Sequence, residues 1–204
     1  MHLVCDFDST LFNTEKIWSE WLEILVARGV DRTHAIRQME ILNATGWTHH
    51  AHALASGIDE TAVDELVKNF LAHTKSIGSE LVYDDVVPFF KKNRPPHTFS
   101  ILTYGNEEYQ TSKILSTSLQ NYFDAIRIAG PNHLKVDHLR TLLEHEATPL
   151  VFVDDSPNEL NPIVDARLPI KLYRIVRPGA KHDYQHERDD VAWKRIKTID
   201  EIIF

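Results

Sequence analysis

Short apolar runs that end in polar residues recur along the chain and predict β-strands. The predicted strands cover residues 3–7, 99–103, 125–129, 150–153 and 170–176. Each run is short and apolar and is closed by acids, glycine or proline, which is the pattern of a buried strand. Stretches of helical periodicity follow the second, third and fourth runs, at residues 106–119, 134–145 and 157–166. Alternating strands and helices predict an α/β fold in which a parallel sheet carries helices on both faces.

The long interval between the first two predicted strands breaks this alternation. Its apolar positions follow helical spacing in residues 15–28, where Gly29 is a stop signal, and in residues 33–43. Asp59 is placed to cap a third helix. A last helix, roughly 84–93, would lead back to the sheet. The interval therefore predicts a small α-helical insertion.

The chain has 204 residues, a length that suits a core domain with a smaller insertion. We expect residues 15–80 to form a helical cap and residues 1–14 and 81–204 to form the core. Hydrophobic residues make up 43% and charged residues 25%, which is an ordinary globular balance. A core of this composition can be buried, so disorder is excluded.

Charge and cysteine content narrow the class of protein. The formal net charge of -8 disfavours nucleic acid and anionic membranes as partners. A single cysteine, Cys5, excludes an intramolecular disulfide and a four-cysteine zinc site. No apolar run reaches transmembrane length, and the first residues lack the basic start and apolar stretch of a signal peptide. We expect a cytoplasmic protein, and its oligomeric state is open.

Two acids, Asp6 and Asp8, follow the first predicted strand with one residue between them. Ligands of parallel α/β sheets bind beyond the carboxyl ends of the strands. There, the Asp6 carboxylate can attack phosphorus and form an acyl-phosphate. The Asp8 carboxyl can protonate the leaving oxygen and later take a proton from water. The alternative is an acidic turn that only caps a helix.

A second pair of acids, Asp154 and Asp155, follows the fourth predicted strand. This pair would meet Asp6 if the first and fourth strands are neighbours. Clustered carboxylates repel one another unless a cation lies among them, and Mg²⁺ prefers oxygen ligands. Ser156 and Pro157 are helix-start signals, so capping explains part of the same stretch and is compatible with a metal site.

A phosphate substrate needs further ligands at the same edge of the sheet. Thr103 ends the second predicted strand, and its hydroxyl beside helix-start amides would suit a phosphate. A lysine should bind the phosphate and keep Asp6 ionised. Lys135, at a helix start beyond the third strand, is favoured for this role. Lys113 is the other candidate, but it lies two turns into its helix and is expected to be solvated.

Taken in order, these residues resemble the four motifs of the haloacid dehalogenase superfamily. Asp6-Phe7-Asp8-Ser9-Thr10 looks like the first motif, and Thr103, Lys135 and Asp154-Asp155 look like the second, third and fourth. The resemblance covers the whole chain, because the helical insertion is similar to the cap that this superfamily often carries after the first motif. It implies a Rossmann-like core and Mg²⁺ bound by Asp6, the Asp8 main-chain oxygen and Asp154, with Asp155 as a further candidate.

Asp8 implies phosphate ester chemistry, because family dehalogenases lack a second acid there and the cation pumps carry lysine. The sequence thus predicts a hydrolase, a magnesium-dependent phosphatase that acts on a small soluble phosphate ester through an aspartyl-phosphate on Asp6. The alternatives are a phosphomutase or phosphotransferase with the same site, and a catalytically silent regulatory module with the same fold. Glu159 resembles an additional acid of many family members, and its role is open, as is the substrate.

Aromatic and histidine residues of the insertion favour packing over chemistry. Trp18 and Trp21 are expected in the core of the insertion, and Trp18, near its start, is also a candidate for substrate contact. His50 and His52 are two residues apart, so they lie on different sides of a helix and argue against a metal site. The polar stretch 181–190 is expected to be a solvated loop.

Overall fold

The computed structural model describes residues 1–45, 47–145, 148–180, 188 and 193–204. The chain divides into two compact units. The core unit comprises Met1–Glu15 and Gly78–Phe204, and the helical unit comprises Lys16–Ile77. Apart from Arg188, the stretch predicted as a solvated loop lies outside the described residues.

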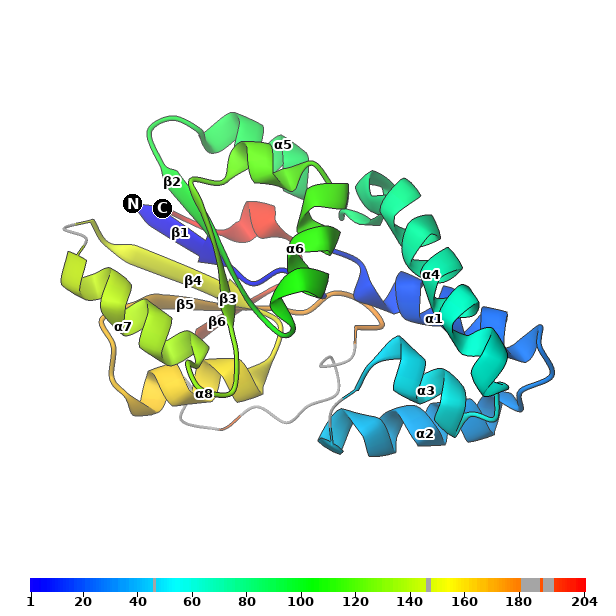
Figure 1. Cartoon of the computed structure of the whole chain (residues 1–204). Helices are drawn as coiled ribbons and strands as arrows, with labels where there is room; N and C mark the ends of the chain where they lie inside the picture. The colour runs from blue at the N-terminus through cyan, green and yellow to red at the C-terminus, as the bar shows by residue number, and fades with distance from the viewer. Residues whose placement is uncertain (46, 146–147, 181–187, 189–192) are drawn as a thin grey trace. The chain divides into compact units, whose positions relative to one another are not determined.

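Within the described residues, the core unit holds a six-stranded parallel sheet in the order β3-β2-β1-β4-β5-β6 (Figure 1). The strands are β1 (His2–Cys5), β2 (Thr98–Tyr104), β3 (Ala125–Ala129), β4 (Leu150–Asp154), β5 (Lys171–Ile175) and β6 (Trp193–Ile196). The predicted Rossmann-like α/β fold is confirmed, and the first five strands match the predicted runs to within two residues. Strand β6 was not predicted, because it is short and its central residues Lys194 and Arg195 are charged and exposed.

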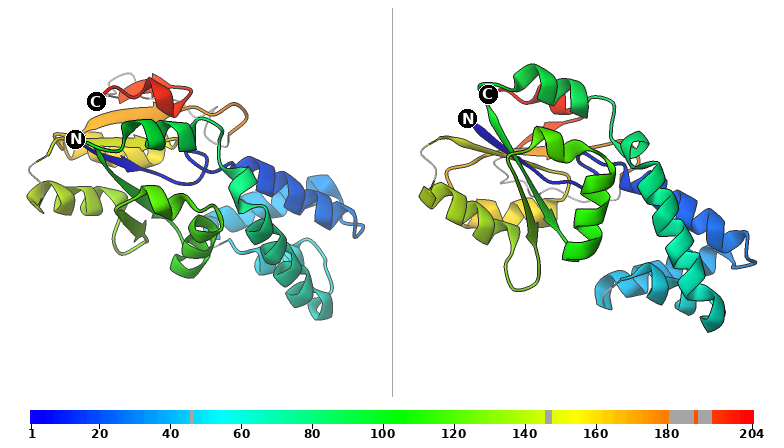
Figure 2. Two further views of the ribbon diagram at one scale, coloured as in Figure 1. Left: turned by 90° about the horizontal axis from the view of Figure 1, so that it is seen from above. Right: turned by 45° about the horizontal axis from the view of Figure 1, so that its top comes forward.

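Helices cover both faces of this sheet (Figures 1 and 2). One face carries α5 (Val86–Asn93) and α6 (Glu107–Ser116), and the other carries α7 (Lys135–His145) and α8 (Pro157–Asp165). Short 3-10 helices lie at η1 (Gly78–Leu81), η2 (Leu119–Tyr122) and η3 (Ile199–Glu201). Both faces of the sheet are therefore buried, which explains why its strands are continuous apolar runs.

Each face of the sheet has its own apolar core. Beneath α7 and α8 a single buried cluster contains Val4, Leu102, Ala129, Leu139, Leu142, Leu150, Phe152, Leu160, Ile163, Ile170, Leu172 and Trp193. On the opposite face Phe90 of α5 packs against Phe99, with ring centroids 4.9 Å apart, and against Phe123, at 4.7 Å. These two cores hold the strand ends in a fixed frame.

The register of the sheet brings two strand ends side by side. Cys5 of β1 is level with Ile101 of β2 and with Val153 of β4. The backbone N–H of Asp6 donates to the Val153 carbonyl at 2.9 Å, which continues the β1–β4 pairing by one residue. The first and fourth strands are therefore neighbours, and Asp6 lies beside Asp154 at the carboxyl edge of the sheet.

The helical unit contains α1 (Thr14–Val26), α2 (Arg32–Thr45), α3 (His49–Ala55) and α4 (Glu60–Ser76). The first two residues of α1 belong to the first segment of the core unit. As the sequence indicates, Gly29 follows α1 with a positive φ of 89°, a conformation that glycine adopts without strain. Asp59 caps α4, where its side chain accepts a hydrogen bond from the Thr61 N–H at 2.9 Å. Trp21 of α1 packs against Phe70 of α4, with ring centroids 4.8 Å apart.

The rings of the helical unit form its core. Trp21 is fully buried, as expected for a core residue, and its indole N–H donates to His52 Nδ1 at 2.9 Å. His52 Nε2 lies 2.8 Å from the Ala35 carbonyl, so that nitrogen carries the proton and donates. Both ring nitrogens of His52 thus form hydrogen bonds within the helical unit. Trp18 is half-buried, with its ring centroid 4.4 Å from that of Trp47.

Among the described residues, no helix is long and apolar enough to cross a membrane.

Candidate active site

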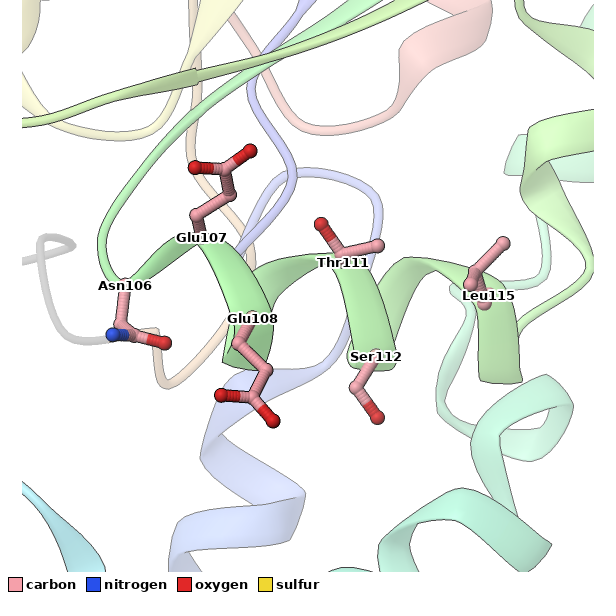
Figure 3. A pocket seen from close by; sticks show the side chains of 6 residues that line it. All are labelled: Asn106, Glu107, Glu108, Thr111, Ser112 and Leu115. Atoms are coloured by element: carbon pink, nitrogen blue, oxygen red, sulfur yellow. The ribbon is translucent and has the colours of Figure 1, made fainter.

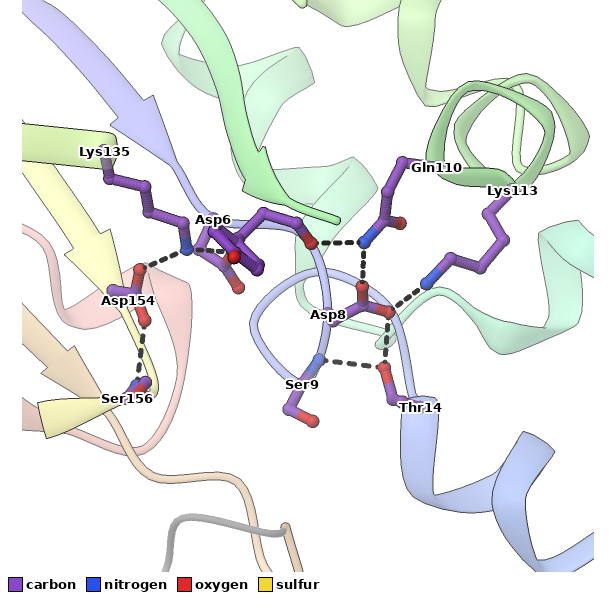
Figure 4. Close-up of polar contacts among 10 residues, drawn as sticks. Asp6, Asp8, Ser9, Thr14, Gln110, Lys113, Lys135, Asp154 and Ser156 are labelled. Carbon is purple, nitrogen blue, oxygen red and sulfur yellow. Dashed lines mark hydrogen bonds and ion pairs between the residues drawn. The ribbon is translucent and has the colours of Figure 1, made fainter. Parts of the chain in front are cut away.

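Asp6 lies at the carboxyl end of β1 and is almost completely buried, with 4% of its surface exposed. Lys135, at the start of α7, donates from Nζ to Asp6 Oδ1 at 2.7 Å and to Asp154 Oδ2 at 2.7 Å (Figure 4). Burial raises the pKa of Asp6 to about 7, and the Lys135 charge opposes this shift. Burial also acts on Lys135, but the charges of Asp154 and Asp6 outweigh it and raise its pKa. The structure therefore brings the predicted nucleophile and the favoured lysine into direct contact.

Three carboxylates gather at this point. Asp6, Asp154 and Asp155 each offer an oxygen, and these oxygens all lie within 4.8 Å of one another. Burial raises the pKa of Asp154, and burial together with the neighbouring acids raises that of Asp155 well above its usual range. One lysine cannot neutralise three carboxylates, and Asp155 Oδ2 is buried without a hydrogen-bond partner. Unshared oxygens and surplus negative charge fit a divalent cation such as Mg²⁺.

Backbone and charged groups hold the acids of β4 in place. Asp154 Oδ1 accepts a hydrogen bond from the Ser156 N–H at 2.8 Å. Ser156 occupies the N-cap position of α8, as the helix-start signals indicate, but its side chain makes no capping hydrogen bond. Arg174 donates from Nε to the Asp155 carbonyl at 3.3 Å. Glu159, in the first turn of α8, is half-buried, and its charge raises the pKa of Lys135 and that of Asp154. Glu159 therefore lies near enough to influence the cluster electrostatically.

Asp8 faces away from the carboxylate cluster in Figure 4 and contacts α6. Its Oδ1 accepts hydrogen bonds from Lys113 Nζ and from the Thr14 hydroxyl, at 2.8 Å for the latter. Its Oδ2 accepts from Gln110 Nε2 at 2.8 Å. Burial alone would raise the pKa of Asp8, but the Lys113 charge and these hydrogen bonds outweigh it and lower the pKa. Asp8 is thus an ionised carboxylate in this structure.

The expectation that Lys113 is solvated was wrong, because only 7% of its side chain is exposed. The sheet places Asp8 under the buried face of α6, and a charged partner there compensates for the loss of water. Gln110 and Thr14 were also missed. For Gln110 a signal was present in the sequence: Gln110 and Lys113 are three residues apart and therefore share one face of the helix.

A tight loop separates the two acids of the first motif. Ser9 has a positive φ of 55°, which is uncommon for a residue other than glycine. Its N–H donates to the Phe12 carbonyl at 2.8 Å and lies 3.2 Å from the Thr14 hydroxyl oxygen. The Thr10 carbonyl accepts from Arg177 Nε at 3.2 Å and from Nη2 at 2.9 Å. This loop turns the chain, so that Asp6 and Asp8 face different partners.

Thr103 lies one residue before the end of β2 and is 1% exposed. The Asn106 side chain caps α6 by accepting a hydrogen bond from the Tyr109 N–H at 3.0 Å. Thr103 therefore lies at the predicted strand end just before a helix start, as the phosphate-seat prediction requires. That prediction itself concerns a ligand and stays a prediction.

The outer face of α6 carries an open pocket (Figure 3). Its lining consists of Asn106, Glu107, Glu108, Thr111, Ser112 and Leu115. Two of these side chains are acids, so the pocket would repel a phosphate. The chemistry of the site lies instead with the buried face of α6 and the carboxyl edge of the sheet.

At the carboxyl edge of this parallel sheet an acid follows β1, and one lysine contacts two acids. Sequence comparison identifies the family of the chain. The model of the haloacid dehalogenase-like hydrolase family matches residues 3–161. The chain belongs to this family, and the resemblance drawn from its motifs is confirmed. Comparison with curated proteins gives no match.

Solved structures of the same family share the fold. A candidate hydrolase of this type from Bacillus subtilis, bound to magnesium, aligns with a TM-score of 0.67 and 11% identity over 98% of this chain and 95% of that one. A candidate phosphoglycolate phosphatase from Lactobacillus plantarum aligns with a TM-score of 0.55 and 16% identity, over 97% and 94%. L-2-haloacid dehalogenase from Xanthobacter autotrophicus, with chloropropionic acid covalently bound, gives 0.57 and 15%, over 89% and 79%. At such identities the likeness shows the fold and does not choose between phosphatase and dehalogenase.

Proposed function

We propose that the protein is a magnesium-dependent phosphatase that hydrolyses a small soluble phosphate ester through an aspartyl-phosphate on Asp6. The observation that carries this proposal is the buried cluster of Asp6, Asp154 and Asp155, in which Lys135 contacts the first two carboxylates. Magnesium would be held by these carboxylates and by the Asp8 main-chain oxygen, and when bound it would neutralise charge on the transferred phosphoryl group. An uncompensated cluster would instead repel an anionic substrate.

Asp6 is the nucleophile in this proposal. Lys135 holds its Oδ1 and favours the ionised form against the effect of burial. Asp6 attacks phosphorus, a new oxygen–phosphorus bond forms, and the bond from phosphorus to the leaving alcohol oxygen breaks. Lys135 and the Thr103 hydroxyl are proposed to bind the phosphoryl oxygens, because both lie at the carboxyl edge of the sheet. The product of this step is an aspartyl-phosphate and an alcohol.

Asp8 supplies the proton transfers. The leaving alkoxide must gain a proton, and a protonated Asp8 carboxyl donates it. The Asp8 carboxylate then takes a proton from water, whose oxygen attacks phosphorus and releases Asp6 and inorganic phosphate. The lowered pKa of Asp8 favours the carboxylate that the second step requires and opposes the protonated form that the first step requires.

The same residue argues for a phosphate ester over a halide. A halide leaves as a stable anion and needs no proton donor, whereas an alkoxide does. A dehalogenase also has no phosphoryl charge that a cation held by the three carboxylates would neutralise. Both Asp8 and the cluster therefore favour phosphate chemistry over the dehalogenation performed by the Xanthobacter enzyme.

We further propose that the helical unit, residues 16–77, acts as a cap that selects the substrate. Its insertion shortly after Asp8 connects it directly to the first motif. The half-buried Trp18 at the start of this unit is the candidate for substrate contact. A small charged metabolite and a single cysteine suit a reducing, cytoplasmic setting.

The proposal is tested by measuring phosphate release from para-nitrophenyl phosphate, sugar phosphates and nucleotides, with magnesium or with chelator. We expect release only with magnesium. Asp154→Asn should abolish it without unfolding the protein, whereas Asp200→Asn, at an exposed carboxylate, should leave it unchanged. Halide release from chloropropionate is assayed in parallel. Halide release without phosphate release, or full activity in chelator, would contradict the proposal.

The remaining alternatives give different products. A phosphomutase or phosphotransferase would convert a sugar phosphate into another sugar phosphate, and would release little inorganic phosphate. A catalytically silent module would bind magnesium but turn over none of the esters. Product analysis of the same reactions by phosphorus NMR separates these outcomes from hydrolysis.

A further inference from the structure

Lys113 is a buried lysine whose ammonium group lies among three aromatic rings and one carboxylate. Its Nζ lies 5.6 Å from the centroid of the Phe7 ring, 5.5 Å from that of Phe12 and 4.9 Å from that of Tyr109. Its side chain is 7% exposed and forms an ion pair with Asp8. A buried ammonium is costly without a partner, so the contact between Lys113 and Asp8 is an obligatory part of this local structure.

Gln110 connects the same carboxylate to the sheet. Its Nε2 donates to Asp8 Oδ2 at 2.8 Å and to the Tyr104 carbonyl, at the end of β2, at 2.8 Å. Thr14 donates its hydroxyl to Asp8 Oδ1. Both carboxylate oxygens of Asp8 are therefore held, and all three donors belong to the core unit. This arrangement restrains the side chain independently of the helical unit.

The position of Lys113 relative to the carboxylate cluster is not that of a phosphate ligand. Figure 4 shows it behind Asp8, on the side away from Asp6, Lys135 and Asp154. Aromatic rings enclose it, and its charge is already matched by a carboxylate. Proton transfer requires that an acid or base be held within a fraction of an ångström of its working position. A rigid pair of donors behind Asp8 meets that requirement.

We propose that Lys113, together with Gln110, is a positioning residue that holds the Asp8 carboxylate for its proton transfers. This inference rests on the proposed phosphatase function, in which Asp8 is the acid and base. Lys113 acts through Asp8 and does not touch the substrate. The role is specific to the two proton-transfer steps, and therefore differs from the role of Lys135, which contacts the nucleophile itself.

The first measurement tests the pair in solution, whatever the enzyme acts on. The midpoints of thermal unfolding are measured for wild type, Asp8→Asn, Lys113→Met and the double variant. If the ion pair exists, each single variant lowers the midpoint, and the double variant lowers it by less than the sum of the two changes. Strict additivity would overturn the proposal. Lys92→Met, at an exposed lysine of α5, is the matched control and should leave the midpoint unchanged.

The second measurement tests positioning by steady-state kinetics on para-nitrophenyl phosphate. We expect Lys113→Met to lower kcat by roughly 10- to 100-fold and to change KM by less than about threefold, since general acid–base catalysis is worth about 10² to 10⁴. Lys113→Arg, which retains the charge, should recover most of the loss. In an Asp8→Asn background, where turnover stalls after one burst, Lys113→Met should change the rate constant of the nitrophenol burst by less than about twofold, because the residue it positions is already disabled.

The outcomes separate the two proposals. Coupled unfolding midpoints with an unchanged kcat in Lys113→Met would overturn positioning and leave Lys113 as a structural partner of Asp8. Coupled midpoints in a wild-type protein that hydrolyses no phosphate ester would overturn the proposed function, and the catalytic role of Lys113 with it. A loss of rate that persists undiminished in the nitrophenol burst of the Asp8→Asn background would show that Lys113 acts elsewhere, which also contradicts positioning.

Discussion

Two buried lysines of the core unit, Lys135 and Lys113, each hold one of the two acids of the first motif, and they do so in opposite electrostatic settings. Lys135 lies among Asp6, Asp154 and Asp155, where acids outnumber it. Lys113 pairs with Asp8, and aromatic rings enclose its ammonium group. The negative charge of the acids around Lys135 therefore exceeds the positive charge of the lysine, whereas the charges of Lys113 and Asp8 balance.

This difference shows how one short motif can hold two carboxylates with different tasks. Burial raises the pKa of Asp6 to about 7, and the charges of Asp154 and Asp8 add to this shift. In the same cluster Asp155 Oδ2 has no hydrogen-bond partner, so a cation can bind it. At Asp8 the lysine outweighs burial and lowers the pKa. Environments that push two carboxylates apart in pKa are typical of an assigned nucleophile and a separate acid or base. The predictions below test this contrast, from the largest effect to the smallest.

The largest effect should come from exchanging each acid for its amide. Asp6→Asn removes the proposed nucleophile and should lower turnover of para-nitrophenyl phosphate by about 10⁴-fold or more, with no phenol burst. Asp8→Asn should release about one equivalent of nitrophenol per active site and then stall, because a good leaving group needs no acid while the second step needs a base. Intact-mass measurement should find phosphate on Asp8→Asn only. Steady turnover without an adduct would contradict the covalent mechanism.

The second effect concerns the lysine that contacts the nucleophile. Lys135→Met removes the cation that two carboxylates share, so those acids should protonate and the nucleophile should be lost. We expect kcat to fall by about 10³-fold, a larger loss than for Lys113→Met. Because Lys135 also serves the phosphate in our proposal, KM should rise as well. Equal losses in kcat for the two lysine variants, with KM unchanged in both, would erase the contrast between the two sites.

The third effect is the pH dependence of stability. The ordinary pKa of an aspartate is near 3.8, and that of Asp6 in the metal-free protein is about 7. Between these values the folded protein keeps a proton that the unfolded chain has released, so its stability should fall as pH rises through this window. Magnesium binds the ionised cluster and should restore stability, by about 2.7 kcal/mol at about a hundred times its Kd.

Thermal unfolding with magnesium or chelator measures this effect. The midpoint gain from magnesium should be small at about pH 5 and large at about pH 8. Asp8 should behave differently from Asp6. Because the pKa of Asp8 is lowered, its contribution to stability is lost only when the pH falls below the ordinary pKa of an aspartate. In the Asp154→Asn variant the gain from magnesium should disappear, and in Lys113→Met it should persist. A magnesium gain that is independent of pH would argue against a cluster of raised carboxyl pKa values.

The smallest effect should come from Glu159. This half-buried acid acts on Lys135 and Asp154 through its charge. Glu159→Gln should weaken magnesium affinity by about threefold, which is the usual scale for a partly solvated charge interaction. Titration calorimetry with magnesium measures it, and Glu144→Gln at an exposed position of α7 is the control. A loss as large as that of Asp154→Asn would make Glu159 a direct ligand.

Local patterns in the sequence predict the fold class, the five main strands of the core and the helical insertion. Periodicity is a local property, and each element carries its own signal within a few residues. The sequence also indicated Asp6, Asp8, Asp154 and Asp155, because acids at the ends of parallel strands converge on one edge of the sheet. Strand β6 was not predicted, because a short edge strand with charged central residues has little apolar pattern.

Packing of the whole core sets which residues contact these acids. The sequence favoured Lys135 as the partner of Asp6 but gave no sign that Lys113 contacts Asp8. The side chain of Lys113 lies 105 positions along the chain from Asp8, and that of Lys135 lies 129 positions from Asp6. Both lysines stand in ordinary amphipathic helices, so their local sequence distinguishes a solvated lysine from a buried one poorly. The order of strands and the face that each helix turns toward the sheet set these pairings. Those features result from packing of the whole core, and they make Lys135 a partner of the nucleophile and Lys113 a partner of Asp8.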